Sequence, residues 1–151
     1  MRWIDVGEQL DARDRSLTVV RPPLFDSPSS RGFVDSATGA FWAVDSFGAN
    51  FPGAVVERDD VPDDLYEETF AALNTWNTPW LEWVDHARFD AHLPATEALD
   101  VALVASAHGP VLRGDAIAGG YRRTRARAGS PPVPHPGQEV LAMVLSMLAP
   151  A

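Results

Sequence analysis

The sequence predicts a mixed α/β (α+β) fold, organised as a single domain over residues 1–151. Two apolar runs of strand-like composition, residues 40–45 and 101–105, lie on either side of a stretch with helical periodicity. Each run leads to a side chain that can bind metal, Asp45 in the first and His108 in the second, with a glycine close behind. A chain of this length can bury ~68–70% of the surface that its unfolded form exposes, so one substantial core is expected.

Four short segments rich in β-branched or aromatic residues predict strands at residues 2–6, 17–21, 32–35 and 40–45. The polar residues 7–11 are expected to form the turn between the first two. Pro22 and Pro23 end the second, because proline has no N–H for a strand ladder. The last two flank a short turn that ends in Gly39, which is typical of a β-hairpin.

Apolar side chains at helical spacing predict helices at residues 60–76, 115–127 and 138–148, with a polar helical stretch at residues 85–93. The first is expected to begin with Asp60 as its cap and Pro62 in its first turn. Three tryptophans near its end, Trp76, Trp80 and Trp83, are expected to fasten it to the sheet. Residues 130–137 form a proline-rich connector to the last, apolar helix, which needs a partner surface.

Composition excludes several classes of function. The net charge of −9 argues against nucleic acid as a general partner, since phosphate binding needs a positive field. The arginines of residues 121–127 are expected to form a solvated helix face, with contact to an anion as the alternative. The chain has no cysteine, so any metal must be held by His, Asp or Glu. No apolar run approaches the ~20 residues of a membrane span and no secretion signal is visible, which favours a cytoplasmic location.

Of the four histidines, only His108 follows a strand-like segment. His86 and His92 are six residues apart, which does not place them on one helix face, and they are expected to be exposed. His135 lies in the proline-rich connector and is expected to be solvated. A histidine in this position is more often structural than a ligand, but its pairing with Asp45 makes the two roles about equally favoured, so both remain open for His108.

Two segments resemble those of a known family. Trp-Ala-Val-Asp-Ser-Phe-Gly at residues 42–48 looks like the segment that carries a bridging aspartate in metallo-β-lactamase-fold proteins, particularly the oxygen-binding di-iron domains of flavodiiron proteins. Ala-Ser-Ala-His-Gly-Pro-Val at residues 105–111 resembles their last metal-ligand segment. The resemblance implies that Asp45 bridges two metal ions and that His108 is a terminal ligand to one. Carboxylate and imidazole ligands suit iron or zinc.

The chain also departs from this family. The ligand-rich motif H-x-[EH]-x-D-H does not occur in residues 1–44, and Phe25 stands before Asp26 and Ser27 where di-iron members have a further histidine. There is no room for a flavin-binding domain. The resemblance therefore implies the second half of an αββα sandwich with an incomplete site, because Asp45 and His108 supply two ligands and a catalytic zinc normally has three.

Three functions remain as alternatives. The first is a metallo-β-lactamase-fold relative that is not catalytic alone. The second is a metal-dependent hydrolase or di-iron oxidoreductase that becomes active when a partner chain supplies the missing ligands. The third is a non-catalytic binding module. Half a sandwich leaves one apolar sheet face uncovered, so we expect a homo-oligomer or a complementing N-terminal half chain as partner.

Overall fold

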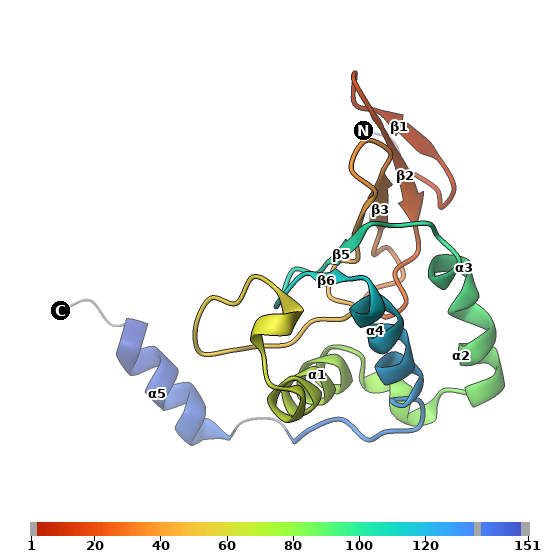
Figure 1. The fold of residues 1–151 in the computed structure, drawn as a ribbon. Coiled ribbons are helices and arrows are strands. Elements are labelled where there is room, and N and C mark those ends of the chain that lie inside the picture. The colour runs from red at the N-terminus through yellow and green to blue at the C-terminus, as the bar shows by residue number, and fades with distance from the viewer. Residues whose placement is uncertain (1–2, 135–136, 149–151) are drawn as a thin grey trace.

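A six-stranded sheet forms the centre of the computed structural model, which describes residues 3–134 and 137–148 (Figure 1). The strands follow chain order across the sheet, and every neighbouring pair is antiparallel except β4 and β5, which are parallel. Their bounds are β1 Gln9–Asp11, β2 Ser16–Val20, β3 Gly32–Asp35, β4 Ala40–Trp42, β5 Leu103–Ala105 and β6 Leu112–Arg113. The predicted α/β fold class is confirmed.

The N-terminal edge of the sheet differs from the prediction. Of the predicted strand at residues 2–6, the described residues 3–6 are not in a strand, and β1 lies instead in the predicted turn. Gly7 has a φ of +90° and redirects the chain, so that Leu10 pairs with Leu17 of β2. The predicted strand at residues 2–6 was therefore wrong, because the turn at Gly7 shifts the first strand to residues 9–11 and strand propensity does not reveal such a turn.

The β3–β4 hairpin is confirmed, and its turn is organised by Asp35. Its carboxylate accepts hydrogen bonds from Ala37 N–H at 3.0 Å and from the Thr38 hydroxyl at 2.7 Å, and it forms an ion pair with Arg15 at 3.1 Å. The Thr38 hydrogen bond, followed by that from Ala37, lowers the pKa of the Asp35 carboxyl. Gly39 closes the turn with a φ of +65°.

All the chain between β4 and β5 is one long crossover connection. It contains η1 Arg58–Asp60, α1 Asp63–Asn77, η2 Pro79–Trp83, α2 His86–His92 and α3 Pro94–Glu97, and α4 Asp115–Arg125 and α5 Gln138–Leu148 follow β6. The predicted cap at Asp60 is wrong, because Asp60 lies in η1 and Pro62 is the N-cap residue of α1. Of the three tryptophans, Trp80 is half-buried, whereas Trp76 and Trp83 are 44% and 80% exposed.

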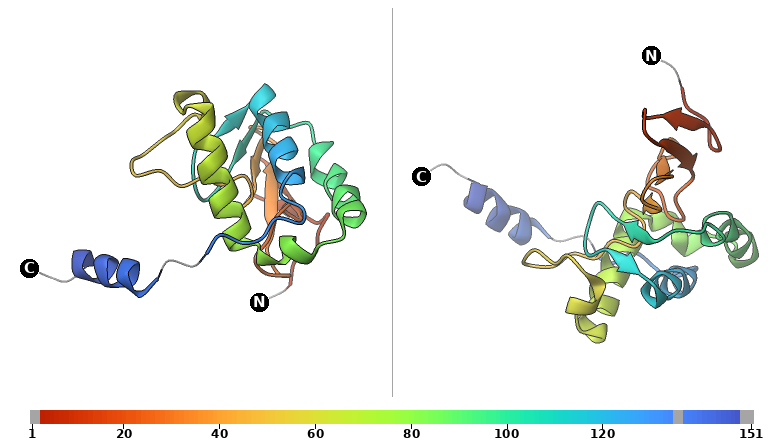
Figure 2. Two further views of the ribbon diagram at one scale, coloured as in Figure 1. Left: turned by 90° about the horizontal axis from the view of Figure 1, so that it is seen from below. Right: turned by 45° about the horizontal axis from the view of Figure 1, so that its top comes forward.

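The two faces of the sheet are covered to different degrees. Cross-strand register places Thr18, Val34, Phe41, Val104 and Leu112 on one face. On this face Phe41, Val104 and Leu112 are at most 1% exposed, in a core that α1 and α4 complete with Tyr66, Phe70 and Tyr121. Seen from below, these helices lie in front of the strands (Figure 2, left).

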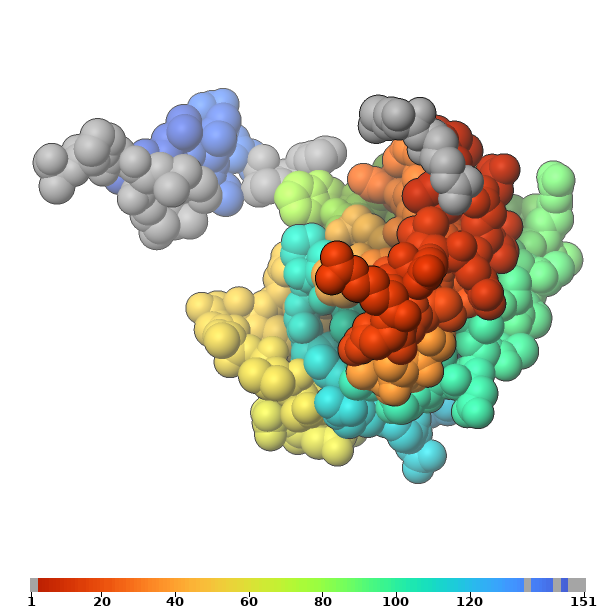
Figure 3. All heavy atoms as spheres, turned by 90° about the horizontal axis from the view of Figure 1, so that it is seen from above, coloured from red at the N-terminus to blue at the C-terminus, as the bar shows by residue number. Residues whose placement is uncertain are grey.

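The opposite face, which we call the open face, carries Val19, Phe33, Trp42, Leu103 and Ala105. Val19 is buried, and the other four side chains are only half-buried. Seen from above, the segments of β1 to β3 and of β5 to β6 lie at the surface with no described helix over them (Figure 3). The helices therefore cover one side of this sheet and leave an apolar surface on the other.

The predicted C-terminal helix is confirmed as α5, which lies apart from the sheet and the other helices (Figure 1). Val140, Leu141 and Leu145 are 42%, 49% and 56% exposed. The prediction for His135 falls outside the described residues. None of the described helices has both the length and the apolar character needed to cross a bilayer.

Candidate metal centre

Asp45 and His108 follow β4 and β5, and because these strands are parallel, both residues lie at the same edge of the sheet. Two backbone hydrogen bonds extend the strand pairing into the loops. Ala43 N–H donates to Ala105 O at 2.8 Å, and Ala107 N–H donates to Val44 O at 2.7 Å. The loops that carry the two side chains are therefore held together by backbone contacts.

The two side chains meet. Nε2 of His108 lies 3.2 Å from Oδ1 of Asp45, and the side chains are 46% and 23% exposed, respectively. The predicted convergence is confirmed, and the pair is accessible to solvent. Metal binding by the pair stays a prediction.

Glycines allow the close approach of the two loops. A Cβ on Gly109, which has a φ of +105°, would lie 2.5 Å from Ala49 O, and a Cβ on Gly48 would lie 3.0 Å from His108 O. Ala49 N–H donates to His108 O at 3.0 Å across the same contact. Only glycine fits at these two positions without displacing backbone.

The loop around Asp45 contains a feature that sequence reasoning missed. Val44 and Phe47 have φ values of +55° and +65°, a left-handed conformation that costs a β-branched residue such as valine ~1–2 kcal/mol. Such strain persists only where the surroundings hold it, and it is concentrated at functional sites. Phe47 is fixed by its ring contact with Tyr121 at 4.9 Å. No local pattern marks a left-handed valine, so only the structure could reveal it.

The described residues place no third metal-binding side chain beside the pair. Among residues 3–134 and 137–148, no group of three or more His, Cys, Asp or Glu side chains is arranged to hold a metal ion. The segment before Asp26 does approach Asp45, because the Ser46 hydroxyl bonds both N–H and C=O of Leu24. Leu24 is an apolar, fully buried side chain, and Phe25 packs on Trp80 with ring centroids 5.3 Å apart. This segment therefore offers no further ligand.

The other histidines behave differently from one another. His86 is exposed, as predicted. His92 is half-buried, because its ring packs edge-on against Phe25 with ring centroids 6.2 Å apart, and its Nε2 is buried with no hydrogen-bond partner in the described part of the chain. The prediction that His92 is exposed was wrong. The packing of α2 against its neighbours, and not the spacing between the two histidines, decides which face of the helix is covered.

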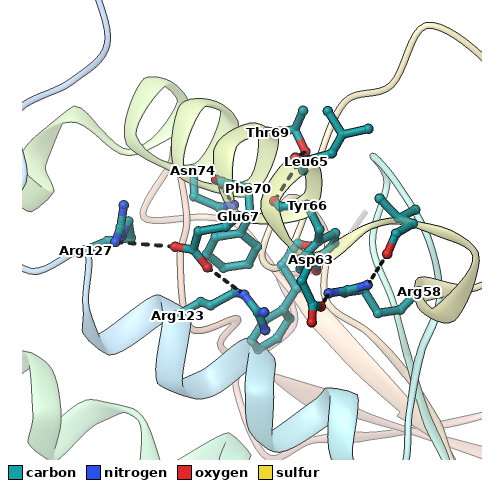
Figure 4. A network of polar contacts seen from close by, with 12 residues as sticks. Arg58, Asp63, Leu65, Tyr66, Glu67, Thr69, Phe70, Asn74, Arg123 and Arg127 are labelled. Atoms are coloured by element: carbon teal, nitrogen blue, oxygen red, sulfur yellow. Dashed lines mark hydrogen bonds and ion pairs between the residues drawn. The ribbon is translucent and has the colours of Figure 1, made fainter.

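Most of the arginines at the end of α4 and just after it form ion pairs within the fold, and Figure 4 shows those of Arg123 and Arg127. Arg123 and Arg127 form ion pairs with Glu67 of α1 at 2.8 and 3.6 Å, and Arg125 pairs with Glu97 of α3. Arg122 alone of the four is exposed. The predicted helix is confirmed as far as Arg125, whereas Arg127 lies beyond its end. Ion pairs within the fold replace most of the predicted solvated face.

Comparison with solved structures identifies the fold. The chain matches the rubredoxin oxygen:oxidoreductase of Desulfovibrio gigas with a TM-score of 0.67 and 17% identity, covering 82% of this chain and 30% of that one. It matches the flavodiiron protein of Giardia intestinalis with a TM-score of 0.68 and 21% identity, covering 83% and 30%. A peroxy di-iron form of the chemotaxis sensor ODP matches with a TM-score of 0.51 and 17% identity, covering 93% and 55%.

At these identities the likeness concerns the fold, and at that level the predicted resemblance to flavodiiron proteins is confirmed. The chain spans about 30% of the length of the flavodiiron proteins it matches, so it corresponds to part of them. No protein-family model matches the chain, and no curated protein does either.

Proposed function

We propose that this chain is one half of a metallo-β-lactamase-type sandwich, that it contributes Asp45 and His108 to an iron or zinc site, and that it is not catalytic by itself. The observation that carries the proposal is the 3.2 Å contact between His108 Nε2 and Asp45 Oδ1 at one sheet edge. Strained backbone around Asp45 supports a functional role for this loop.

The geometry of the pair suits one metal ion. Two donors that bind a single tetrahedral zinc at ~2.0–2.2 Å lie roughly 3.3 Å apart, close to the separation of the Asp45 and His108 atoms. A carboxylate oxygen and an imidazole nitrogen are ligands for both iron and zinc. Asp45 and His108 would therefore hold the ion as neighbouring ligands.

The donor count limits what the chain can do alone. A catalytic zinc normally has three protein ligands and a two-metal site has more, whereas the described residues offer two at this place. Two side chains bind a metal ion weakly, so the isolated chain is not expected to catalyse a metal-dependent reaction.

Zinc titration followed by NMR tests this proposal. Millimolar Zn²⁺ is expected to shift the His108 imidazole signals reversibly, and Asp45→Asn is expected to weaken the effect. Metal analysis after gel filtration is expected to find far less than one iron or zinc per chain. His86→Ala is the matched control, because His86 is exposed and lies on α2, outside the two loops that carry the pair.

Two outcomes would contradict the proposal. Stoichiometric iron or zinc retained by the monomer would show that the site is complete. His108 signals that ignore zinc would show that the pair is not a ligand pair.

The open face supports a second candidate, a metallo-hydrolase or di-iron oxidoreductase completed by a partner. Phe33 and Trp42 are half-buried there, and a second sheet would cover them. If a second copy supplies the missing ligands, the apparent zinc affinity must rise with protein concentration. An affinity that is constant over a hundredfold range would exclude the homo-oligomer and leave a different chain as the required partner.

A further inference from the structure

A cavity lies beside α2, on the side of the sheet that the helices cover. It is an open cavity of about 570 Å³ between the end of β2, η2, α2 and α3. Phe25, Trp80 and Phe89 form its aromatic wall, and Val20 belongs to the covered face of the sheet. Neither Asp45 nor His108 lines it. Small-molecule sites are typically cavities of ~300–1,000 Å³ with apolar, aromatic walls and a few polar groups.

The aromatic wall is fixed before any ligand arrives. Phe25 and Trp80 pack with ring centroids 5.3 Å apart, and Trp80 and Phe89 pack at 6.0 Å. The Trp80 indole N–H donates to Phe25 O at 2.9 Å, which uses the polar atom of that ring. A pre-formed wall lowers the ordering cost of binding.

The charged groups at the cavity are basic. Arg21 and Arg88 line it, and none of the described lining residues is acidic, although the chain as a whole carries a net charge of −9. The Arg21 guanidinium is held by Pro28 O at 2.6 Å and lies 5.1 Å from the Phe25 ring centroid. The Arg88 guanidinium makes no hydrogen bond or ion pair within the described part of the chain.

His92 adds an unsatisfied polar atom to the same wall. Its ring lines the cavity, and its Nε2 is buried without a hydrogen-bond partner among the described residues. Buried polar atoms are nearly always paired, and an orphaned one beside a cavity is explained when a ligand or an ordered water supplies the partner.

We propose that this cavity binds a small organic acid with an apolar, ring-bearing body, whose carboxylate faces Arg88 while the ring stacks against Phe25, Trp80 and Phe89. The guanidinium is suited to a carboxylate because its N–H donors match the two oxygens. A free phosphate or sugar phosphate suits the cavity poorly, because most of the lining is apolar. The inference is independent of the proposed metal site.

Two probes of nearly the same shape, one charged and one uncharged, distinguish the contribution of charge to binding from that of apolar burial. Titration of the full chain with 2-naphthoate and with its uncharged analogue 2-naphthamide is followed through the indole N–H signals of the tryptophans in ¹H–¹⁵N NMR spectra. Trp80→Phe assigns the Trp80 signal. We expect 2-naphthoate to shift that signal and to bind about tenfold more tightly than the amide, a difference of about 1.4 kcal/mol.

Variants then locate the binding. Arg88→Gln is expected to remove the preference for the acid, and Ala95→Trp, at an exposed position of the cavity wall on α3, is expected to abolish binding of both probes. Arg122→Gln is the matched control, because Arg122 is an exposed arginine on α4 that does not line the cavity.

Three results would overturn the proposal: a Trp80 signal that neither probe moves, equal affinities for acid and amide, or unchanged acid binding in Arg88→Gln. Arg88 is exposed and the glutamine variant is expected to fold, so this last comparison stands even if Ala95→Trp disturbs α3.

Discussion

Tyr66 and Tyr121, the only two tyrosines of the chain, are both buried in the helix-covered core. Burial raises the pKa of each phenol to about 12, from an ordinary value of 10. Arg58 and Arg123 oppose this rise at Tyr66, since their positive charges favour the phenolate. The burial effect is the larger of the two.

We predict that neither tyrosine ionises near pH 10 in the folded protein. The pKa of each phenol is higher in the folded chain than in the unfolded chain, so between pH 10 and about 12 the unfolded chain binds fewer protons. The contribution of the two tyrosines to the free energy of unfolding is therefore fully present below pH 10 and is lost as the pH rises from 10 to about 12. Phenolate absorbance followed against circular dichroism checks this, with Tyr66→Phe isolating Tyr121. Phenolate that appears near pH 10 with the fold intact would contradict it.

At the scale of elements, the contact between the two site loops depends on Gly109. We predict that Gly109→Ala destabilises the fold by about 2 kcal/mol or more, because its Cβ would meet Ala49 O at 2.5 Å and the φ of +105° is unfavourable for alanine. Chemical denaturation measures the loss, and His108 NMR signals report whether the histidine moves. Gly53→Ala is the control, since nothing lies within 4 Å of its Cβ. Equal stability of both variants would refute the prediction.

The start of α1 is held by the buried Arg58 (Figure 4). Its guanidinium donates to Val61 O at 2.7 Å, pairs with Asp63 and lies 4.2 Å from the Tyr66 ring centroid. Because Asp63 is 89% exposed, the ion pair itself contributes little, and the stacking and the carbonyl hydrogen bond dominate.

We predict that Arg58→Lys lowers the free energy of unfolding by about 1–2 kcal/mol, because an ammonium cannot stack and reach Val61 O together. Thermal and urea unfolding measure the change. Arg122→Lys, at an exposed position of α4, is expected to leave the free energy of unfolding unchanged. A loss of equal size there would show that the effect does not depend on the contacts of Arg58.

At the scale of the whole molecule, we expect the covered face of the sheet to determine the stability of the fold and the open face to determine self-association. Leu103 and Val104 are neighbours in β5 with side chains on opposite faces. We predict that Val104→Thr costs about 1–3 kcal/mol, because it buries a hydroxyl in the covered core, and leaves self-association unchanged.

We predict that Leu103→Thr weakens self-association and leaves the free energy of unfolding nearly unchanged. Threonine is a good strand residue, and the substitution reduces the apolar surface of the open face. Sedimentation velocity over a range of protein concentrations and urea unfolding measure the two properties. A chain that stays monomeric at all concentrations, with or without Leu103→Thr, would show that the open face does not bind a second copy.

Much of this architecture could be predicted from the sequence. Runs of apolar, β-branched and aromatic residues located the β3–β4 hairpin and β5, and the helical spacing located α1, α4 and α5. The convergence of Asp45 and His108 followed from two strands that end at glycine-containing loops. β1 was missed because three residues at an edge carry little propensity signal.

Side-chain surroundings were harder to predict. The burial of His92 and the aromatic cavity depend on Phe25 and Trp80, which are far apart in the sequence and meet only in the folded chain. The left-handed Val44 is imposed by tertiary contacts against its own preference. Contacts of this kind leave no periodic trace in a single sequence.

The parallel pairing of β4 with β5 also affects the order in which the parts of this chain can fold. The hairpin from Gly32 to Trp42 closes over a few residues, whereas β5 reaches β4 only after the chain through η1, α1, η2, α2 and α3 has been spanned. Closing so long a loop costs more entropy and slows folding, so we expect this pairing to form in the late steps. The carboxylate of Asp45 and the imidazole of His108 therefore become neighbours only when the crossover is complete, and their proximity is a marker of the finished fold.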